Sequence, residues 1–137
     1  MRKFRIGSHT ADKTIIVESD SYEGLFTSAM EGLAYLLSGE DKSRENESEV
    51  IKKIKIESID SSCLIVDFLS EVLSQSYINK VIFHKIKYDI LSETELSATI
   101  KGNKIEEFEE DIKAITYFGA NIKYDNSLYK VEILLDI

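Results

Sequence analysis

The chain has 137 residues, of which 43% are hydrophobic and 31% charged, a composition that is typical of soluble globular proteins and excludes disorder and fibrous assembly. At about 150 residues per domain, we expect one domain spanning 1–137. The 25 acidic residues outnumber the 17 basic ones, and the net charge of −8 argues against tight direct binding to nucleic acid or to anionic membranes. There is no membrane-length apolar run, no signal-peptide core and only one cysteine, Cys63, so we expect a cytoplasmic protein.

The N-terminal third predicts two strands followed by an amphipathic helix. Apolar residues at both ends of Phe4–Val17 surround a polar centre, which indicates two strand pieces joined by a turn. Asp20 and Glu23 have the spacing of a capping box, so we expect a helix to begin at Asp20. Apolar residues then recur every three or four positions until Gly39, which is a typical helix stop.

A second helix is predicted in the middle of the chain. The polar stretch Glu40–Glu49 predicts a loop, and the alternation around Ile54 and Ile56 predicts a strand with one buried face. An apolar stripe over Asp60–Ser76 then predicts the second helix, with Asp67 and Glu71 on its exposed side.

The C-terminal half has the period-two pattern of strands. Ile82–Ile90 and Leu96–Ile100 predict paired strands, and the acidic run Glu106–Asp111 predicts a solvated loop. Further strand pattern leads to a turn at Asp125–Ser127 and a last strand over Tyr129–Leu135. Together these elements predict an α+β fold with mainly antiparallel sheets.

The sequence lacks the common enzyme signatures, and its candidate chemistry rests on oxygen atoms. With two histidines and one cysteine, a metal site rich in nitrogen and sulfur is hard to build. Asp12 ends the polar turn His9-Thr10-Ala11-Asp12, and Asp136-Ile137 follows an apolar strand. If these segments lie side by side, their oxygens would suit Mg²⁺, Mn²⁺ or Ca²⁺. Otherwise Asp12 is an ordinary turn residue that bonds its own backbone.

Lys113 is the third candidate, because it lies within a strand pattern between apolar neighbours. A lysine in such a place is usually a solvated residue on the outer face of a sheet. The functional alternative is a positive group held near carboxylates or directed at a phosphate of a partner's ligand.

Four segments, in this order, resemble the archease family. They span the chain from end to end and are His9–Asp12, Val66–Leu73, Lys113–Tyr117 with Gly119, and Asp136–Ile137. The resemblance implies a fold of nested strand-helix-strand-strand units. It also implies a protein cofactor, and not an enzyme, that promotes guanylylation and multiple turnover of RtcB-type tRNA-splicing RNA ligases.

The same resemblance assigns roles to single residues. Asp12 and Asp136 would be metal ligands, with a main-chain or terminal oxygen of Ile137 completing the set. Lys113 would assist the active site of the partner ligase. His9 would orient a metal-ligating side chain without itself binding the metal. The sequence departs from the family pattern at Lys13-Thr14, Phe68, Ser70 and Phe118, and its acidic loop before Lys113 is shorter than usual.

Two other functions stay open at this point. One is a stand-alone divalent-metal-dependent enzyme acting on a small phosphorylated substrate, although the sequence offers no evident acid-base partner for the carboxylates other than His9. The other is an acidic adaptor protein that carries no metal.

Overall fold

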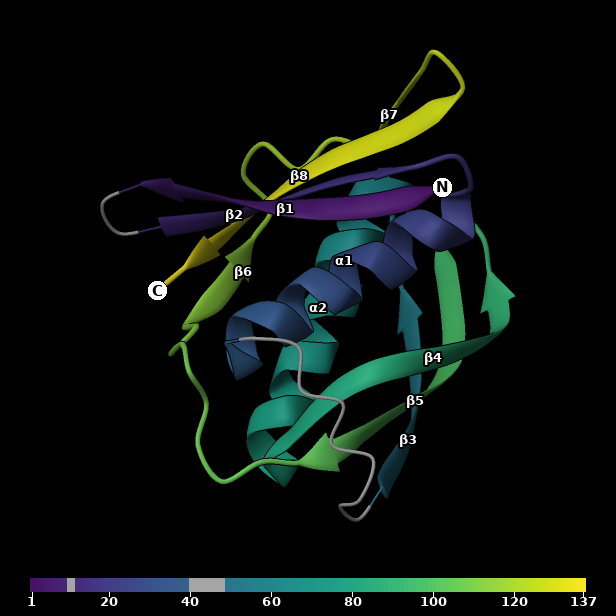
Figure 1. Cartoon of the computed structure of the whole chain (residues 1–137). Helices are drawn as coiled ribbons and strands as arrows, with labels where there is room; N and C mark the ends of the chain where they lie inside the picture. Colours follow the sequence, from purple (N-terminus) through teal and green to yellow (C-terminus); the bar gives the residue numbers. More distant parts are fainter. Residues whose placement is uncertain (10–11, 40–48) are drawn as a thin grey trace.

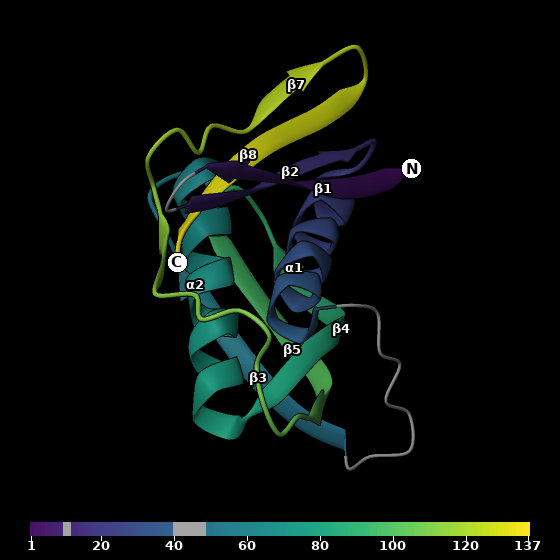
Figure 2. The ribbon, with the colours of Figure 1, turned by 60° about the vertical axis from the view of Figure 1, so that its left-hand side comes forward.

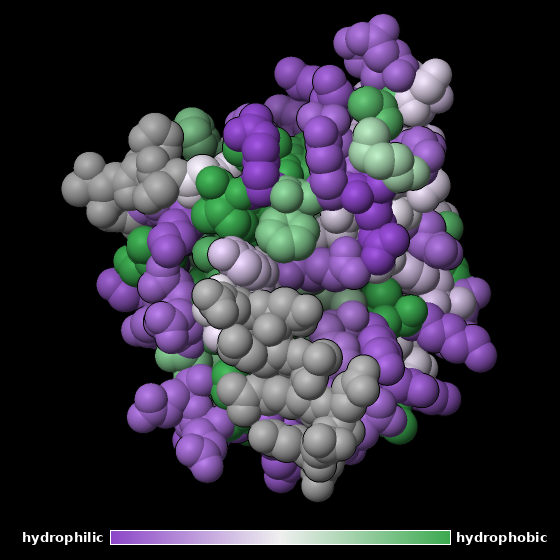
Figure 3. Space-filling view, viewed as in Figure 1, coloured by the Kyte–Doolittle hydropathy of each residue, from purple (hydrophilic) through white to green (hydrophobic). Residues whose placement is uncertain are grey.

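The computed structural model describes residues 1–9, 12–39 and 49–137, and the side chains of residues 8 and 9 lie outside that description. The elements follow in the order β1, β2, α1, β3, α2, β4, β5, β6, β7 and β8 (Figure 1). No helix of the described residues is long and apolar enough to cross a membrane. Polar side chains dominate the face seen in Figure 3, with apolar ones scattered among them.

The first sheet, sheet A, is antiparallel and has five strands. Four strands lie in the order β1-β2-β8-β6, and the fifth, β7, also pairs with β8. The strands are β1 (Arg2–His9), β2 (Asp12–Ser19), β6 (Ala114–Thr116), β7 (Lys123–Asp125) and β8 (Leu128–Asp136). The predicted N-terminal strand pair is confirmed, and its pairing extends into the polar stretch that was predicted as turn.

The second sheet, sheet B, has three antiparallel strands in the order β3-β5-β4. They are β3 (Glu49–Glu57), β4 (Val81–Leu91) and β5 (Glu95–Lys104). The predicted strand around Ile54 and the later strand pair are therefore confirmed. Of the loop predicted over Glu40–Glu49, residues 40–48 lie outside the described residues and Glu49 begins β3.

Two helices, α1 (Tyr22–Ser38) and α2 (Ser61–Asn79), lie between the sheets (Figures 1 and 2). Helix α1 packs on β1 and β2 of sheet A and on β4 of sheet B, while α2 packs on all three strands of sheet B and on β6. The unit β3-α2-β4-β5 is inserted between α1 and the last strands of sheet A. The α+β prediction with nested strand-helix-strand-strand units is confirmed.

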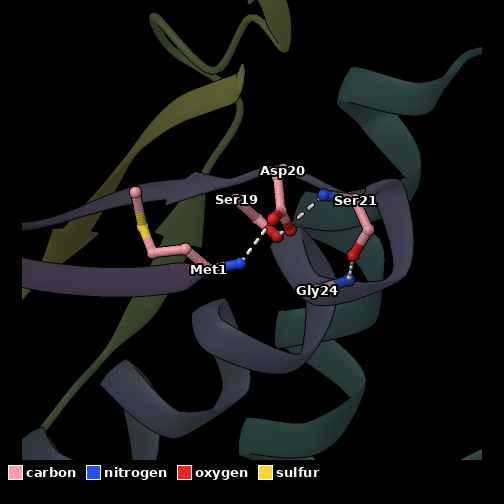
Figure 4. A network of polar contacts seen from close by, with 5 residues as sticks. All are labelled: Met1, Ser19, Asp20, Ser21 and Gly24. Carbon is pink, nitrogen blue, oxygen red and sulfur yellow. Dashed lines mark hydrogen bonds and ion pairs between the residues drawn. The ribbon is translucent and has the colours of Figure 1, made fainter. Parts of the chain in front are cut away.

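The N-cap of helix α1 lies one residue later than predicted. Its N-cap is Ser21, whose hydroxyl accepts a hydrogen bond from the Gly24 backbone N–H at 3.0 Å (Figure 4). Asp20 instead faces the N-terminal amine of Met1 at 2.5 Å, and this hydrogen bond lowers the pKa of the Asp20 carboxyl. The prediction of Asp20 as cap is therefore wrong, because a neighbouring residue with equal capping ability was available and Asp20 had a cationic partner. The predicted stop at Gly39 is confirmed by its φ of 87°.

Helix α2 begins as predicted and ends later. The Asp60 carboxylate caps it by accepting from the Cys63 N–H at 2.8 Å. The helix continues to Asn79, three residues beyond the predicted end, and Lys80 terminates it in the left-handed conformation. The residues past Ser76 carry little apolar pattern, but Tyr77 packs against the core and keeps the last turn helical.

The region after β5 is less regular than its pattern predicts. The acidic run 106–111 is confirmed as a loop, and the stretch that follows contributes only the three-residue strands β6 and β7 to sheet A. The predicted turn before β8 is confirmed, with positive φ at Asn126 and Ser127, as tight hairpins require. The last strand places Tyr129, Val131, Ile133 and Leu135 on one face as the alternation predicts, and the last three are buried while Tyr129 is half-buried.

Candidate functional site

One end of sheet A brings together the segments that the sequence singled out. Asp12 of β2 pairs with Asp136 of β8, in register. On either side of this pair, His9 of β1 is opposite Asp12 and Ala114 of β6 is opposite Asp136. His9, Asp12, Asp136 and Ala114 therefore form one row across four adjacent strands.

Asp12 and Asp136, which we call the carboxylate pair, lie on the outward face of sheet A. The alternate residues Ile15, Ile133 and Leu135 are buried against the helices. Because successive side chains of a strand point to opposite faces, Asp12 and Asp136 project away from the core. Asp12 is half-buried and Asp136 is exposed.

The geometry of the carboxylate pair suits a hard cation. Residues directly opposite in an antiparallel pair have Cβ atoms about 4.5–5.5 Å apart, and two like charges at that spacing destabilise the sheet. A divalent cation bound by both carboxylates would remove this repulsion, and oxygen is the ligand that Ca²⁺, Mg²⁺ and Mn²⁺ prefer. No group of three or more His, Cys, Asp or Glu side chains suited to a metal occurs among the described residues. The remaining ligands would therefore be main-chain oxygens and water.

Ile137 and Lys113 adjoin the pair. Ile137 directly follows Asp136 and packs partly against the core. The Lys113 backbone N–H donates to the Asp136 carbonyl at 2.8 Å. Lys113 precedes β6, although it was predicted to lie within a strand, and its side chain is exposed.

A tyrosine of α2 positions the backbone just before Lys113. The Tyr77 hydroxyl donates to the Ile112 carbonyl at 3.0 Å and accepts from the Ile112 N–H at 2.7 Å. Burial is the main cause of the raised pKa of Tyr77. Both main-chain groups of this buried residue are thereby hydrogen-bonded. The backbone is therefore held in place at Ile112, directly before Lys113.

An ion pair ties the acidic loop to β2 beside the site. The Lys13 ammonium lies 2.5 Å from the Glu110 carboxylate, and both side chains are largely covered, with 30% and 25% exposure. Lys13 is one of the departures from the family pattern noted in the sequence. In this chain it holds the loop that leads into Ile112 and Lys113.

Asp67 was predicted on an exposed helix face, and that prediction is wrong. Its carboxylate accepts from the Ser58 hydroxyl at 2.5 Å and from the Tyr117 hydroxyl. The hydrogen bond to Asp67 is the main cause of the raised pKa of Tyr117. The contact joins two of the segments that carry the family resemblance, and no local pattern could reveal it because the partners are 50 residues apart.

The structure therefore brings Asp12, Asp136, Ile137 and the backbone of Lys113 to one end of sheet A. His9 shares the row through its backbone register, while its side chain and residues 10–11 of the same motif lie outside the described residues. The positions agree with the prediction of a shared site, and the roles of the residues stay predictions.

Fold and site define a small α+β protein of nested units with paired carboxylates at the end of one sheet. The model of the archease protein family (MTH1598/TM1083) matches residues 4–137, and the chain belongs to this family. It is 29% identical to protein archease of Methanosarcina mazei, covering 99% of this chain and 97% of the relative. Protein archease of Methanosarcina acetivorans is 24% identical over the same shares.

Two solved structures have the same fold. The solution structure of Methanobacterium thermoautotrophicum protein 1598 has a TM-score of 0.72 at 23% identity, covering 98% of each chain. The crystal structure of a Thermotoga maritima archease, described as a possible chaperone, has a TM-score of 0.68 at 19% identity, covering 94% of this chain and 93% of that one.

Proposed function

We propose that this protein activates an RtcB-type tRNA-splicing RNA ligase, promoting guanylylation and multiple turnover, and that it is not itself a ligase. Membership of the archease family supports the proposal. The observation that carries it is the in-register pairing of Asp12 with Asp136 next to the Lys113 backbone. An exposed sheet end of this kind is accessible to a protein partner.

The carboxylates of Asp12 and Asp136 would hold a divalent cation, Ca²⁺, Mn²⁺ or Mg²⁺, together with the main-chain oxygen of Ile137. When bound, the cation would supply positive charge at this sheet end. The exposed ammonium of Lys113 suits a phosphate in the partner's active site, since lysine contacts phosphate as a point charge. Tyr77 and the Lys13–Glu110 ion pair keep the segment before Lys113 in place.

A multiple-turnover ligation assay tests the proposal. An RtcB-type ligase is given excess RNA with wild-type protein, with Asp12→Asn, or with Glu132→Gln as the control. Glu132 lies on the same strand face as Asp136 but is opposite the neutral Ile16, so the control removes one negative charge without touching the pair. We expect stimulation by wild type and Glu132→Gln and its loss in Asp12→Asn.

Two results would contradict the proposal. Equal stimulation by Asp12→Asn would remove the carboxylate pair from the function. Metal-dependent turnover of a small phosphorylated substrate by the protein alone, with no effect on the ligase, would favour the stand-alone enzyme.

A further inference from the structure

The outward face of sheet B carries a cluster of lysines in an otherwise acidic protein. Along β3, and along Lys85–Asp89 of β4, every second residue is exposed, and β5 between them presents its less buried side on the same face. This face, the lysine face, is defined by Lys53, Lys55, Lys85, Lys87 and Lys101. Five of the chain's 17 basic residues therefore lie on one side of a three-stranded sheet.

Among residues 1–9, 12–39 and 49–137, no carboxylate forms an ion pair with the lysine face. Acidic residues of the three strands lie toward their ends: Glu49, Glu57, Asp89 and Glu95. The middle of the face is therefore locally positive, although the whole chain carries −8.

Register and spacing give the face a regular pattern. Lys53, Thr99 and Lys87 form one row across the three strands, which places the two lysines about 10 Å apart at the backbone. Lys101 and Lys85 are directly opposite in the next row. Lysines two residues apart along a strand are about 7 Å apart. The Thr99 hydroxyl lies between Lys53 and Lys87, and Ser97 is opposite Lys55 on one side and Ile90 on the other. Phosphate oxygens accept from both ammonium and hydroxyl groups.

We propose that the lysine face binds the phosphate backbone of RNA, and that the RNA is the one joined by the partner ligase. The second part rests on the proposed function, whereas RNA binding itself does not. Lysine is depleted in protein–protein interfaces, whose centres need aromatic, Met or Arg anchors. The middle rows of the face offer lysine and hydroxyl side chains, with the exposed Ile51 and Ile90 on the two edge strands. They offer no aromatic, Met or Arg anchor, so an RNA backbone fits them better than a protein does.

Binding through this face is weak, independent of sequence and sensitive to salt. The lysine rows present no arginine for bidentate contact with bases and no aromatic ring for stacking. Non-specific contacts of this kind give dissociation constants of about 10⁻⁴ to 10⁻⁶ M at physiological salt. This range is compatible with the absence of tight binding that the net charge predicts.

The lysine face and the carboxylate pair lie on different sides of the helices. Sheets A and B both pack on α1 and α2, and their outward faces point away from that layer (Figures 1 and 2). A ligase engaged at the carboxylate pair therefore leaves the lysine face accessible to the body of a long RNA.

The test is fluorescence anisotropy of the isolated protein with a labelled single-stranded RNA, over about 50 to 200 mM salt. Lys53→Gln/Lys87→Gln removes two charges from one row. Lys123→Gln/Lys130→Gln is the matched control, because these exposed lysines are directly opposite each other on sheet A. We expect the first variant to lower the salt slope by about 1.4 and the affinity at 0.1 M salt about tenfold, while the control binds as wild type does.

Three outcomes would overturn the proposal: no binding at about 50 mM salt, equal loss in both variants, or preference for another polyanion. The last is measured with polyglutamate and with phosphatidylserine vesicles in place of RNA. Circular dichroism melting of both variants confirms that each is folded. Because no ligase is present, failure here leaves ligase activation intact, and failure of Asp12→Asn to affect ligation leaves RNA binding intact.

Discussion

The outward faces of sheets A and B follow the same construction, and each carries a local charge cluster, which is acidic at one end of sheet A and basic in the middle of sheet B. Both belong to antiparallel sheets that bury their other face against the same two helices. At one end of sheet A the register makes Asp12 and Asp136 neighbours, and across sheet B it makes neighbours of lysines from separate strands. Register therefore converts residues that are scattered along the chain into two local charge clusters, which the net charge of −8 does not reveal.

The largest effect is expected from removing Asp136 and Ile137. The deletion removes half of the carboxylate pair and the Asp136 carbonyl that accepts from Lys113, and we expect ligase stimulation to be lost. The core strand keeps Ile133 and Leu135, so unfolding free energy should fall by only about 1–3 kcal/mol for the lost Ile137 contact. Urea titration and the turnover assay measure the two quantities.

Appending a short Gly-Ser tail after Ile137 is the complementary variant. It retains Asp136 and the Ile137 carbonyl but moves the terminal carboxylate away, and we expect it to stimulate the ligase. If the truncated and the extended proteins both stimulate as wild type does, the assignment of the C-terminal residues to the site is wrong.

Tyr77→Phe is expected to weaken the support of the carboxylate end without changing its charge. Two main-chain groups of the buried Ile112 lose their hydroxyl partner, and each such loss costs about 1–3 kcal/mol. Urea unfolding should show the decrease, whereas Tyr124→Phe, at an exposed ring, should not. A change below about 0.5 kcal/mol would show that water or another group replaces the hydroxyl.

Tyr22 contacts both sheets, and its ionisation should make the free energy of unfolding depend on pH. Its hydroxyl donates to the Ser92 carbonyl at the β4–β5 turn, and its ring packs on Tyr129 of β8. The pKa of Tyr22 is raised to about 12, mainly because the side chain is buried. The folded state therefore holds this proton above the ordinary value of about 10, so the stabilisation is complete below pH 10 and is lost as the pH rises through 12.

In urea titrations at increasing pH, Tyr22→Phe should therefore lose less stability between about pH 10 and pH 12 than wild type does. Parallel curves for the two proteins over that range would show that ionisation of Tyr22 does not destabilise the folded state.

The smallest effect is expected for the ion pair between Lys13 and Glu110. A double-mutant cycle with Lys13→Gln and Glu110→Gln should give a coupling free energy of about 0.2–1 kcal/mol, because both side chains keep 25–30% of their surface in contact with solvent, which screens the pair. The coupling should decrease in high salt. A coupling of zero would mean that the acidic loop is held by its other contacts alone, such as Phe108 against Tyr77.

Most of the fold could be predicted from the sequence. In long amphipathic segments such as α1 and β8, the spacing of apolar residues indicates both the type of element and its buried face. The first residue of α1 could not be predicted, because Asp20 and Ser21 are both good N-caps and tertiary contacts determine which of them caps the helix. The short strands β6 and β7 owe their pairing to β8 and have little pattern of their own.

The candidate site was predictable only as separate segments. The family resemblance indicated Asp12, Asp136 and Lys113. That the two carboxylates are neighbours could be seen only from the register of β2 and β8. Asp67 looked like a solvated helix residue because its partner Tyr117 is distant in sequence. The alternating lysines of β3 and β4 were visible in the sequence, but their common face depends on β5 lying between the two strands.

The central claim is that the carboxylate pair binds a divalent cation. Calorimetric titration of Mn²⁺ into wild type, Asp12→Asn and Glu132→Gln tests it most directly. We predict binding by wild type and Glu132→Gln and its loss in Asp12→Asn, because a neutral amide is a poorer ligand for a hard cation than a carboxylate is. Equal affinity in Asp12→Asn, or no binding by the wild-type protein, would contradict the claim.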